Sequence, residues 1–320
     1  MRARVVVFWA VVGVLGLPAL LLTFTRLVEP YGELWIQVEA FTPLGLLLYA
    51  VVLAALVARL LAVRRWWSVT SVAAVVALGC LGLHGWWYAP QVTGANPPPA
   101  RDATPLVVMT ANLQFGGADG VEVVRRASAA EVGLLVVQEI TPAVLADMDR
   151  AGLADLLPHR IGVPGGGARG TMAFARGELS GSMPLSTTND SWSFRLDDLT
   201  VIAVHAAWPP DTSRWYADHH AIARATDRLE PDLVVGDFNA TDDHAPMRAL
   251  ADAGYRDAGE LANEGWQATW PTSGLFDVVG VPLAQIDHVL VGGSLAALST
   301  RTVGVPGSDH RAVLATVAPR

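Results

Sequence analysis

The chain contains no lysine and only one cysteine among its 320 residues. With the single thiol of Cys80, no internal disulfide can form, so cysteine content gives no sign of the compartment. A metal site in this chain must use oxygen and imidazole ligands, since a cluster of thiolates is excluded. All 22 basic residues are arginine, which we interpret as a compositional bias of the genome rather than as a mechanism.

Basic side chains are scarce in the part of the chain that follows residue 90. From residue 91 onward, 16 arginines stand against 27 acidic residues, a formal net charge of −11. Proteins that hold long nucleic acid backbones usually carry a basic face, because neutralisation of phosphates provides much of the affinity. The acidic balance argues against a tight nucleic-acid binder, and an exported nuclease that binds loosely stays open.

Long apolar runs are present, and almost all of them precede residue 90. Three segments, residues 5–25, 43–63 and 66–90, each reach the roughly 20 residues that a helix needs to cross the hydrocarbon core. We therefore expect residues 1–90 to form a membrane anchor of three transmembrane helices. His84, near one end of the third segment, is expected at the level of the lipid headgroups.

The distribution of arginines indicates how this anchor is oriented. Arg2 and Arg4 precede the first segment, and Arg64 and Arg65 lie between the second and the third. The loop between the first and the second segments is acidic instead. By the positive-inside rule, the N-terminus is cytoplasmic and three crossings place the rest of the chain outside the cell. We expect a multi-pass protein of the cell membrane; a cleaved signal peptide is the alternative for the first segment, but no small-residue cleavage site follows Thr25.

After a Pro-rich linker at residues 91–104, residues 105–320 are predicted to form one mixed α/β domain. Apolar runs typical of buried strands alternate there with amphipathic helical patterns. The strand-like runs are residues 106–110, 133–137, 201–204, 233–235 and 286–291, and the helical ones are residues 121–130 and 214–229. The glycine-rich residues 165–170 lack the Lys-Ser/Thr of a P-loop, so we expect a hairpin or a loop at the edge of a site.

The run at residues 233–235 ends in Gly236-Asp237-Phe238-Asn239. Side chains two apart in an extended segment point the same way, so Asp237 and Asn239 face one spot. A carboxylate beside a carboxamide suits a site that handles water and a phosphoryl oxygen next to a hard cation. Similar residues follow other strand-like runs: Asn112, Gln138-Glu139, His205, Asp287-His288 and Ser308-Asp309-His310. Each alone is more often a satisfied buried group or a turn residue, but together they indicate a site.

Taken in order, these motifs resemble those of the endonuclease/exonuclease/phosphatase superfamily, which includes DNase I-like nucleases, inositol polyphosphate 5-phosphatases and neutral sphingomyelinases. The resemblance runs from Leu106 to the C-terminus, with Trp270-Pro271 as a weaker match. It implies a four-layer α/β sandwich, with two central sheets packed face to face and helices outside. The layout, three transmembrane helices followed by such a domain, is similar to that of membrane-anchored members linked to teicoplanin resistance.

The resemblance also implies the role of each residue, in a hydrolysis that depends on Mg²⁺ or Mn²⁺ and needs no covalent intermediate. The residues implied at the metal are Asn112, Glu139 and Asp309. The residues implied in catalysis are His205, Asp237, Asn239, Asp287 and His310. Asp237 would orient or deprotonate the attacking water, Asn239 would bind a phosphate oxygen, and Asp287 would hold the ring of His310. His288 matches no family position, and we expect it at the surface or in packing.

The function expected from these observations is a membrane-anchored, metal-dependent phosphoesterase that acts outside the cell on a phosphate-containing substrate. An envelope lipid is the substrate that tethering favours, and a monoester, a diester and a pyrophosphate all stay open as the bond that is cut. Two alternatives remain: an exported endonuclease or exonuclease, and a catalytically inactive binding module that keeps the fold.

Overall fold

The structure, a computed structural model, describes residues 2–94, 96–273 and 281–320. The chain divides into two compact units. The first comprises residues 1–90 and 243–245, and the second comprises residues 91–242 and 246–320.

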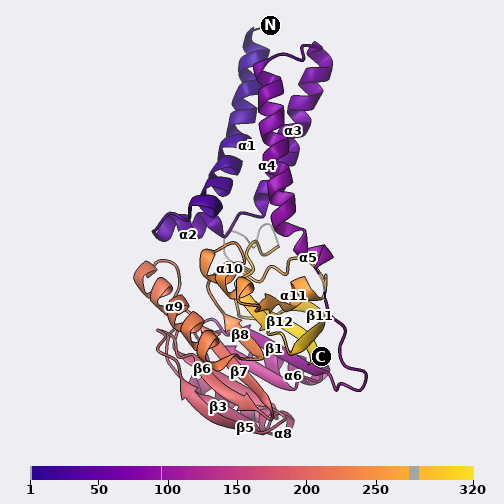
Figure 1. The fold of residues 1–320 in the computed structure, drawn as a ribbon. Coiled ribbons are helices and arrows are strands. Elements are labelled where there is room, and N and C mark those ends of the chain that lie inside the picture. The colour runs from indigo at the N-terminus through magenta and orange to yellow at the C-terminus, as the bar shows by residue number, and fades with distance from the viewer. Residues whose placement is uncertain (1, 95, 274–280) are drawn as a thin grey trace. The chain divides into compact units, whose positions relative to one another are not determined.

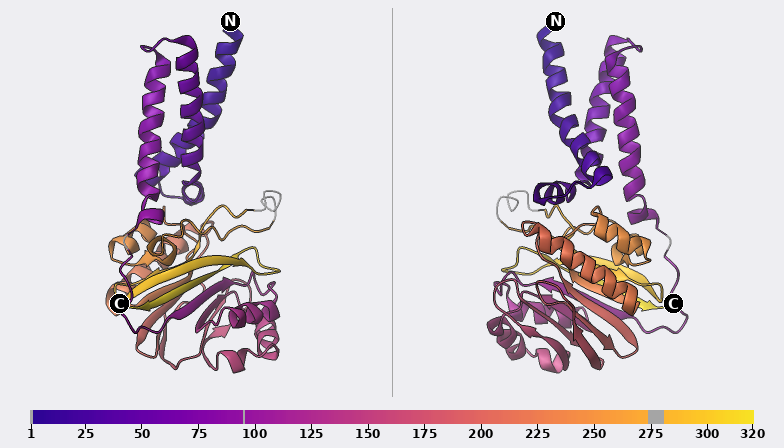
Figure 2. Two further views of the ribbon diagram at one scale, coloured as in Figure 1. Left: turned by 90° about the vertical axis from the view of Figure 1, so that its right-hand side faces the viewer. Right: turned by 60° about the vertical axis from the view of Figure 1, so that its left-hand side comes forward.

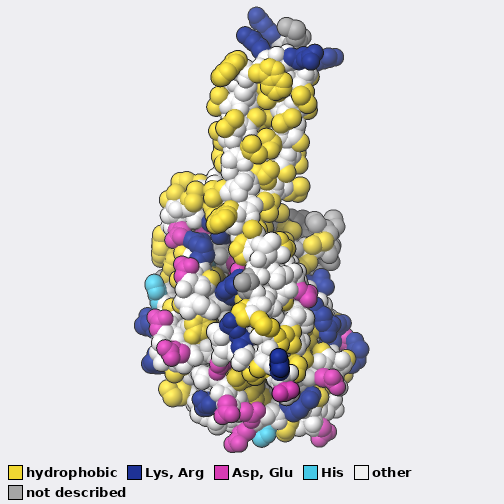
Figure 3. Space-filling model, turned by 45° about the vertical axis from the view of Figure 1, so that its right-hand side comes forward, with side chains coloured by type: hydrophobic (Ala, Val, Ile, Leu, Met, Phe, Trp, Pro, Cys, Tyr) yellow, Lys and Arg dark blue, Asp and Glu magenta, His cyan; other side chains and the backbone are white. Residues whose placement is uncertain are grey.

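Three long helices make up most of the first unit. They are α1 (Arg2–Val28), α3 (Leu44–Val63) and α4 (Val69–Tyr88), and the short α2 (Glu33–Glu39) lies between the first two in the chain. Each of the three is long and apolar enough to cross a membrane. Hydrophobic side chains cover the helices and basic side chains gather at one end of them (Figure 3). These features support the expected membrane anchor.

A buried polar cluster links the three long helices. The Thr23 hydroxyl lies 2.7 Å from the Tyr49 hydroxyl and 3.0 Å from His84 Nε2. His84 is fully buried among the helices, so its side chain points into the anchor rather than outward, while its expected level at the headgroups stays a prediction. A hydrogen-bonding partner and the space left by Gly45, where a Cβ would collide with the imidazole, favour the interior position instead.

The second unit is built on two six-stranded mixed sheets, seen from several sides in Figures 1 and 2. The first sheet has the order β11 (Leu295–Gly304), β12 (Arg311–Pro319), β1 (Leu106–Asn112), β2 (Leu134–Gln138), β4 (Gly170–Ala175) and β3 (His159–Pro164). The second has the order β5 (Leu179–Pro184), β6 (Trp192–Leu196), β7 (Leu199–His205), β8 (Leu233–Asp237), β10 (Asp287–Val291) and β9 (Arg256–Asp257).

The alternation of side chains along the strands produces two apolar cores. Val108 and Val136 of the first sheet belong with Val201 and Val235 of the second sheet to the core between the sheets. The intervening residues of the first sheet point the other way, toward the helices α6 (Gly120–Ala129) and α7 (Pro142–Arg150), where a second core forms. The inner strands β1, β2, β4 and β12 of the first sheet therefore have apolar residues on both faces.

Helices cover both outer faces of the paired sheets, which completes the four layers. α6 and α7, followed by the short α8 (Leu153–Leu156), lie on the first sheet. α9 (Thr212–Leu229) lies along the outer face of the second sheet, as Figure 2 shows, with α10 (Ala245–Asp252) close to it. The short α11 (Ala258–Leu261) follows β9. The expected α/β sandwich preceded by three long apolar helices is therefore confirmed.

Two connecting segments differ in how far they follow the sequence-based expectations. The glycine-rich residues 165–170 join β3 to β4 in a hairpin, as expected. The Pro-rich segment begins with α5 (Pro90–Thr93) and is hydrogen-bonded along the domain rather than extended away from it. Gln91 O accepts from Gly265 N at 3.0 Å, and Ala100 N donates to Pro319 O at 2.9 Å.

Candidate active site

Strand register brings three of the expected residues into one row on the second sheet. His205 of β7 and Asp287 of β10 are both paired with Asp237 of β8. Residues that are directly opposite each other on neighbouring strands project to the same face of the sheet. All three are almost completely buried, so their chemistry takes place away from bulk water.

The first sheet contributes Asn112 and Glu139, from the ends of β1 and β2. Glu139 comes directly after β2 and adopts a left-handed backbone, with φ of 57°. Its Oε2 accepts a hydrogen bond of 2.6 Å from Phe115 N. A left-handed conformation is strained for a residue other than glycine, so the surrounding contacts must hold it.

Asn112 connects the two sheets through its carboxamide. Its Nδ2 donates to Asp237 Oδ2 at 2.9 Å and to Glu139 Oε1 at 3.2 Å. Its Oδ1 accepts from Gln114 N at 2.9 Å. Because the amide nitrogen serves two carboxylates, this geometry suits an orienting group, and the second lone pair of Oδ1 keeps the predicted role as a metal ligand open.

His310 and Asp287 form a buried ion pair. His310 Nδ1 lies 2.8 Å from Asp287 Oδ2, which leaves Nε2 as the nitrogen available to a substrate. Burial alone would lower the pKa of His310, but the charge and hydrogen bond of Asp287, assisted by Asp237, raise it to about 10. His310 is therefore a cation at neutral pH, suited to an anionic phosphoryl group.

Burial raises the pKa of the carboxyl groups in the site and lowers the pKa of the second imidazole. Burial, and then the charge of Asp287, raises the pKa of Asp237 to about 7. Burial also raises the pKa of Glu139, although hydrogen bonds from Asn112 and Phe115 act against this. His205 is neutral because burial, with the nearby His310 cation, lowers its pKa to about 3.

These side chains fit a hard divalent cation. The carboxylate oxygens of Asp237 and Asp287 lie within 4.8 Å of each other, and the protonated His310 beside them is not itself a ligand. Asp287 Oδ1 is buried without a hydrogen-bond partner among the described residues. Carboxylate oxygens are the donors that such cations prefer, and a cation would relieve the repulsion between these buried carboxylates. The resemblance implied a different metal set, Asn112, Glu139 and Asp309, which shares no residue with this cluster.

Asp309 and Asn239 lie at the margin of this cluster. Asp309 Oδ2 accepts from Trp270 Nε1 at 3.2 Å, and its Oδ1 is 3.9 Å from His310 Nε2. Asn239 Nδ2 donates to Ala206 O at 3.0 Å and lies 3.5 Å from Asp237 Oδ2. All eight residues singled out from the sequence thus belong to one neighbourhood of the domain.

The model of the Endonuclease/Exonuclease/phosphatase family matches residues 109–310, more than half of the chain. The chain belongs to this family. Its members are typically phosphoester hydrolases and commonly use divalent metals, and the buried acidic and histidine cluster agrees with that chemistry. A search of curated proteins gave no match.

Solved structures show the same fold as the second unit. A protein of the endonuclease/exonuclease/phosphatase family from Bacteroides thetaiotaomicron is 16% identical with a TM-score of 0.54, over 68% of this chain and 99% of its own. An AP endonuclease from Archaeoglobus fulgidus is 13% identical with a TM-score of 0.55, over 66% and 98%. TDP2 from D. rerio, solved with a single-strand DNA product, is 13% identical with a TM-score of 0.53, over 67% and 99%.

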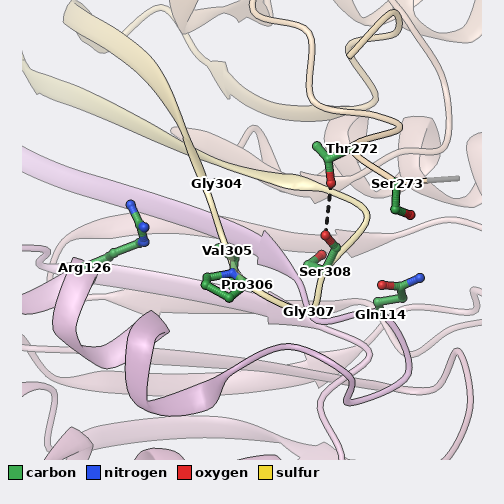
Figure 4. A pocket seen from close by; sticks show the side chains of 9 residues that line it. All are labelled: Gln114, Arg126, Thr272, Ser273, Gly304, Val305, Pro306, Gly307 and Ser308. Atoms are coloured by element: carbon green, nitrogen blue, oxygen red, sulfur yellow. Dashed lines mark hydrogen bonds between the residues drawn. The ribbon is translucent and has the colours of Figure 1, made fainter. Parts of the chain in front are cut away.

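A cavity of about 520 Å³ adjoins the site of this family member. Figure 4 shows Arg126 on one side of the loop that contains Pro306 and Gly307, with Gln114, Thr272 and Ser273 on the other. The cavity is linked to the site through Ser308, because Ser308 Oγ donates to Asn112 O at 2.8 Å. Arg126 and the hydroxyl groups of Thr272, Ser273 and Ser308 make part of its lining polar, beside the apolar Val305 and Pro306.

Two buried residues make hydrogen bonds beside the site that the sequence did not predict. His288, expected at the surface or in packing, is fully buried and bonded to Asp257 and to Ala240 O. Trp215 Nε1 donates to Asn239 O at 2.8 Å. The sequence signal was weak because each looks like an ordinary core residue, and only the contacts of the folded chain distinguish them.

Proposed function

We propose that the protein is a membrane-anchored phosphoesterase that depends on a divalent metal, Mg²⁺ or Mn²⁺. The observation that carries the proposal is the convergence of two buried groups. Asn112 bridges Glu139 and Asp237 across the two sheets, and Asp287 holds His310 beside them. Buried carboxylates next to a fixed imidazolium suit phosphoryl transfer to water.

Glu139 is the carboxylate we assign to the metal, with Asp309 and Oδ1 of Asp287 as further acidic donors and Asn112 as the residue that orients Glu139. When bound, the cation offsets negative charge on the phosphoryl and leaving oxygens. The absence of thiolates and the number of oxygen donors favour Mg²⁺ or Mn²⁺ over softer metals.

Asp237 is the residue we assign to the attacking water. Its pKa of about 7 lets the carboxylate accept a proton near neutral pH, which matches the requirement for a general base. Its Oδ1 is fixed by Asn239 N at 2.8 Å, and its Oδ2 is fixed by Asn112. Asn239 lies close enough to bind a phosphate oxygen with its carboxamide.

We assign His310 to bind the negatively charged phosphoryl group. The bond from Nδ1 to Asp287 fixes the ring, so Nε2 can donate a hydrogen bond to a phosphoryl oxygen. His205, neutral and with Nε2 3.7 Å from Glu139 Oε1, provides a second imidazole for the same group. Water attacks phosphorus and gives a proton to Asp237, the bond to the leaving oxygen breaks with its electron pair staying on that oxygen, and no covalent bond to the protein forms.

The substrate we propose is a phosphate ester or pyrophosphate of a lipid in the cell envelope. The net charge of −11 after residue 90 disfavours a long polyanion. Among the described residues that line the cavity beside the site, Arg126 is the only basic one, and it also pairs with Glu122 at 2.8 Å, so the cavity suits a single phosphate better than a nucleic acid backbone. The arginines at residues 2, 4, 64 and 65 support a cytoplasmic N-terminus and a catalytic domain outside the cell.

A substrate panel tests the proposal. The full-length chain in detergent micelles would be incubated with Mg²⁺ or Mn²⁺ and phospholipid, polyprenyl pyrophosphate or plasmid DNA, with chelator as the control. We expect turnover of a lipid substrate that the chelator abolishes. Cleavage of plasmid DNA alone would replace the lipid hydrolase with the nuclease, and a folded protein inert on every substrate would favour the binding module.

A further inference from the structure

The turn that carries Asp237 and Asn239 has a conformation that the chain does not favour by itself. Gly236 has φ of 147°, and a Cβ there would collide with the backbone of Val204. Asn239 is left-handed, with φ of 48°. Such a conformation at a residue other than glycine costs on the order of 1–3 kcal/mol, and it persists only where neighbouring groups hold it.

Two buried rings hold consecutive carbonyl groups of this turn. Trp215 Nε1 of α9 donates to Asn239 O at 2.8 Å. His288 Nε2 of β10 lies 2.9 Å from Ala240 O. A carbonyl oxygen only accepts, so His288 Nε2 must carry the hydrogen. The turn is therefore hydrogen-bonded to a helix and to a strand, at the carbonyl of the strained residue and at the next carbonyl.

His288 is itself fixed from its other side. Its Nδ1 lies 3.0 Å from Asp257 Oδ2, while Asp257 Oδ1 accepts from Gly259 N at 2.7 Å at the start of α11. Asp242 Oδ1 is 3.7 Å away, and the Phe238 ring meets the imidazole edge-on at 5.5 Å. The ring is fully buried, so it has no freedom to swing away from the turn.

The register of β10 explains why two neighbouring residues have separate tasks. Asp287 is paired with Asp237 and faces the site, whereas His288 is paired with Gly236 and points to the opposite face. On that opposite face, His288 Nε2 reaches the carbonyl of Ala240 at 2.9 Å. β10 thus directs Asp287 toward the site and His288 toward the turn that follows β8.

We propose that His288, together with Trp215, is a positioning residue that locks the turn Asp237–Ala240 for phosphoester hydrolysis. The inference rests on the proposed function for its effect on turnover, but the locking of the turn is a property of the chain alone. His288 touches no substrate; it acts through the backbone that aims Asp237 and Asn239.

Two substitutions at one position separate the two hydrogen bonds of His288. His288→Gln places an amide nitrogen near the former Nε2 and keeps a donor for Ala240 O. His288→Asn places one near the former Nδ1 and keeps a donor for Asp257 instead. Val291→Ala, on the same strand, removes buried apolar volume without touching the turn and serves as the stability control.

We expect His288→Asn to lower kcat about 10- to 100-fold on bis-p-nitrophenyl phosphate, with a smaller rise in KM, because the displaced turn misplaces both Asp237 and the phosphate-binding Asn239. His288→Gln should retain most of the turnover, and Val291→Ala should melt earlier with kcat unchanged. All variants would be the full-length chain in detergent micelles. Trp215→Phe, which loses the other donor, would replace His288→Asn if that variant does not fold.

Amide hydrogen exchange across residues 236–241 gives a readout that does not need activity. Exchange should be faster in His288→Asn than in His288→Gln and Val291→Ala. Equal exchange in all three, or equal kcat in the Asn and Gln variants, would overturn the inference. A wild-type chain without turnover would reject the proposed function, while exchange would still decide whether His288 locks the turn.

Discussion

Replacing Asp287 with asparagine tests whether this carboxylate keeps His310 charged. The two side chains have nearly the same shape, but the charge 2.8 Å from His310 Nδ1 is lost. With an effective dielectric constant of about 20, Coulomb's law gives on the order of 6 kcal/mol at that 2.8 Å distance, or roughly 4 pKa units as an upper bound. Because Asp237 and Asp309 also raise the pKa of His310 and remain in place, we expect a fall of about 2–3 units from the value of about 10.

The sign of the effect on stability follows from the same pKa. His310 has a folded pKa above its usual value of 6.5, so protonation stabilises the domain fully below about pH 6.5 and this contribution is lost as the pH rises through about 10. In Asp287→Asn, the loss should occur at lower pH. A pKa lowered to about 7–8 still leaves His310 at least half protonated near neutral pH, so we attribute the fall in turnover expected there, about 10²- to 10⁴-fold, to loss of the carboxylate that orients the ring and stabilises its charge. The loss of the proton should lower turnover further toward pH 9.

Two measurements check this prediction. NMR titration of the histidine side chains in metal-free protein, with His310→Gln to assign the signal, gives the pKa directly. A pH–rate profile of both proteins gives its consequence for turnover. An unchanged pKa of His310 in Asp287→Asn would refute the reasoning, since no other described carboxylate is hydrogen-bonded to that ring.

Further predictions concern the metal, Asp237, Asn112 and the orientation of the chain. Mg²⁺ or Mn²⁺ at about 100 times its Kd should stabilise the wild type by about 2.7 kcal/mol, and Glu139→Gln should lose most of that rise in melting temperature; an equal rise in the variant would exclude Glu139 as a ligand. Because Asp237 has a folded pKa of about 7, above 3.8, its protonation stabilises the metal-free domain fully below about pH 3.8 and this is lost as the pH rises through 7. Asp237→Asn should therefore flatten the fall in melting temperature between about pH 5 and 8, and an unchanged slope would contradict the assignment. Asn112→Ala removes the donor shared by two carboxylates and should lower kcat about 10- to 100-fold, so wild-type kinetics would rule out the bridge. A reporter fused after Arg320 should be active only outside the cytoplasm; cytoplasmic activity would reverse the orientation.

The sequence was sufficient for the parts of the fold that depend on local patterns. The run that ends at Asp237 was recognisable because its apolar residues are buried on both faces and a glycine stops it. The same holds for the apolar segments of the anchor, whose length alone is diagnostic. The resemblance of the strand-end motifs then supplied the arrangement of the sheets.

Other strands could not be found in this way. β5 (Leu179–Pro184) is almost entirely exposed and contains serine and glycine, so no burial pattern marks it. β11 (Leu295–Gly304) has a register shift between Ala297 and Ser299, which breaks the period-two alternation. Both strands are specified by pairing with a neighbour rather than by their own composition.

The site shows the same division between local and distant information. Residue types at strand ends pointed to Asp237 and His310, but the left-handed backbone of Glu139 and Asn239 depends on contacts from distant segments. The contacts of His288 could not be foreseen, because a histidine in an apolar run gives no sign of the carbonyl it will meet. Its partner Ala240 is 48 residues away.

The most direct test of the phosphoesterase is metal-dependent turnover of bis-p-nitrophenyl phosphate by the full-length chain, compared with Asp237→Asn and His310→Gln. Arg195→Gln, an exposed substitution on β6 away from the site, serves as the control for preparation and folding. We predict turnover that requires Mg²⁺ or Mn²⁺, survives in the control and is lost in both site variants. Turnover that persists in Asp237→Asn and His310→Gln, or that is unaffected by a chelator, would contradict the assignment of this site.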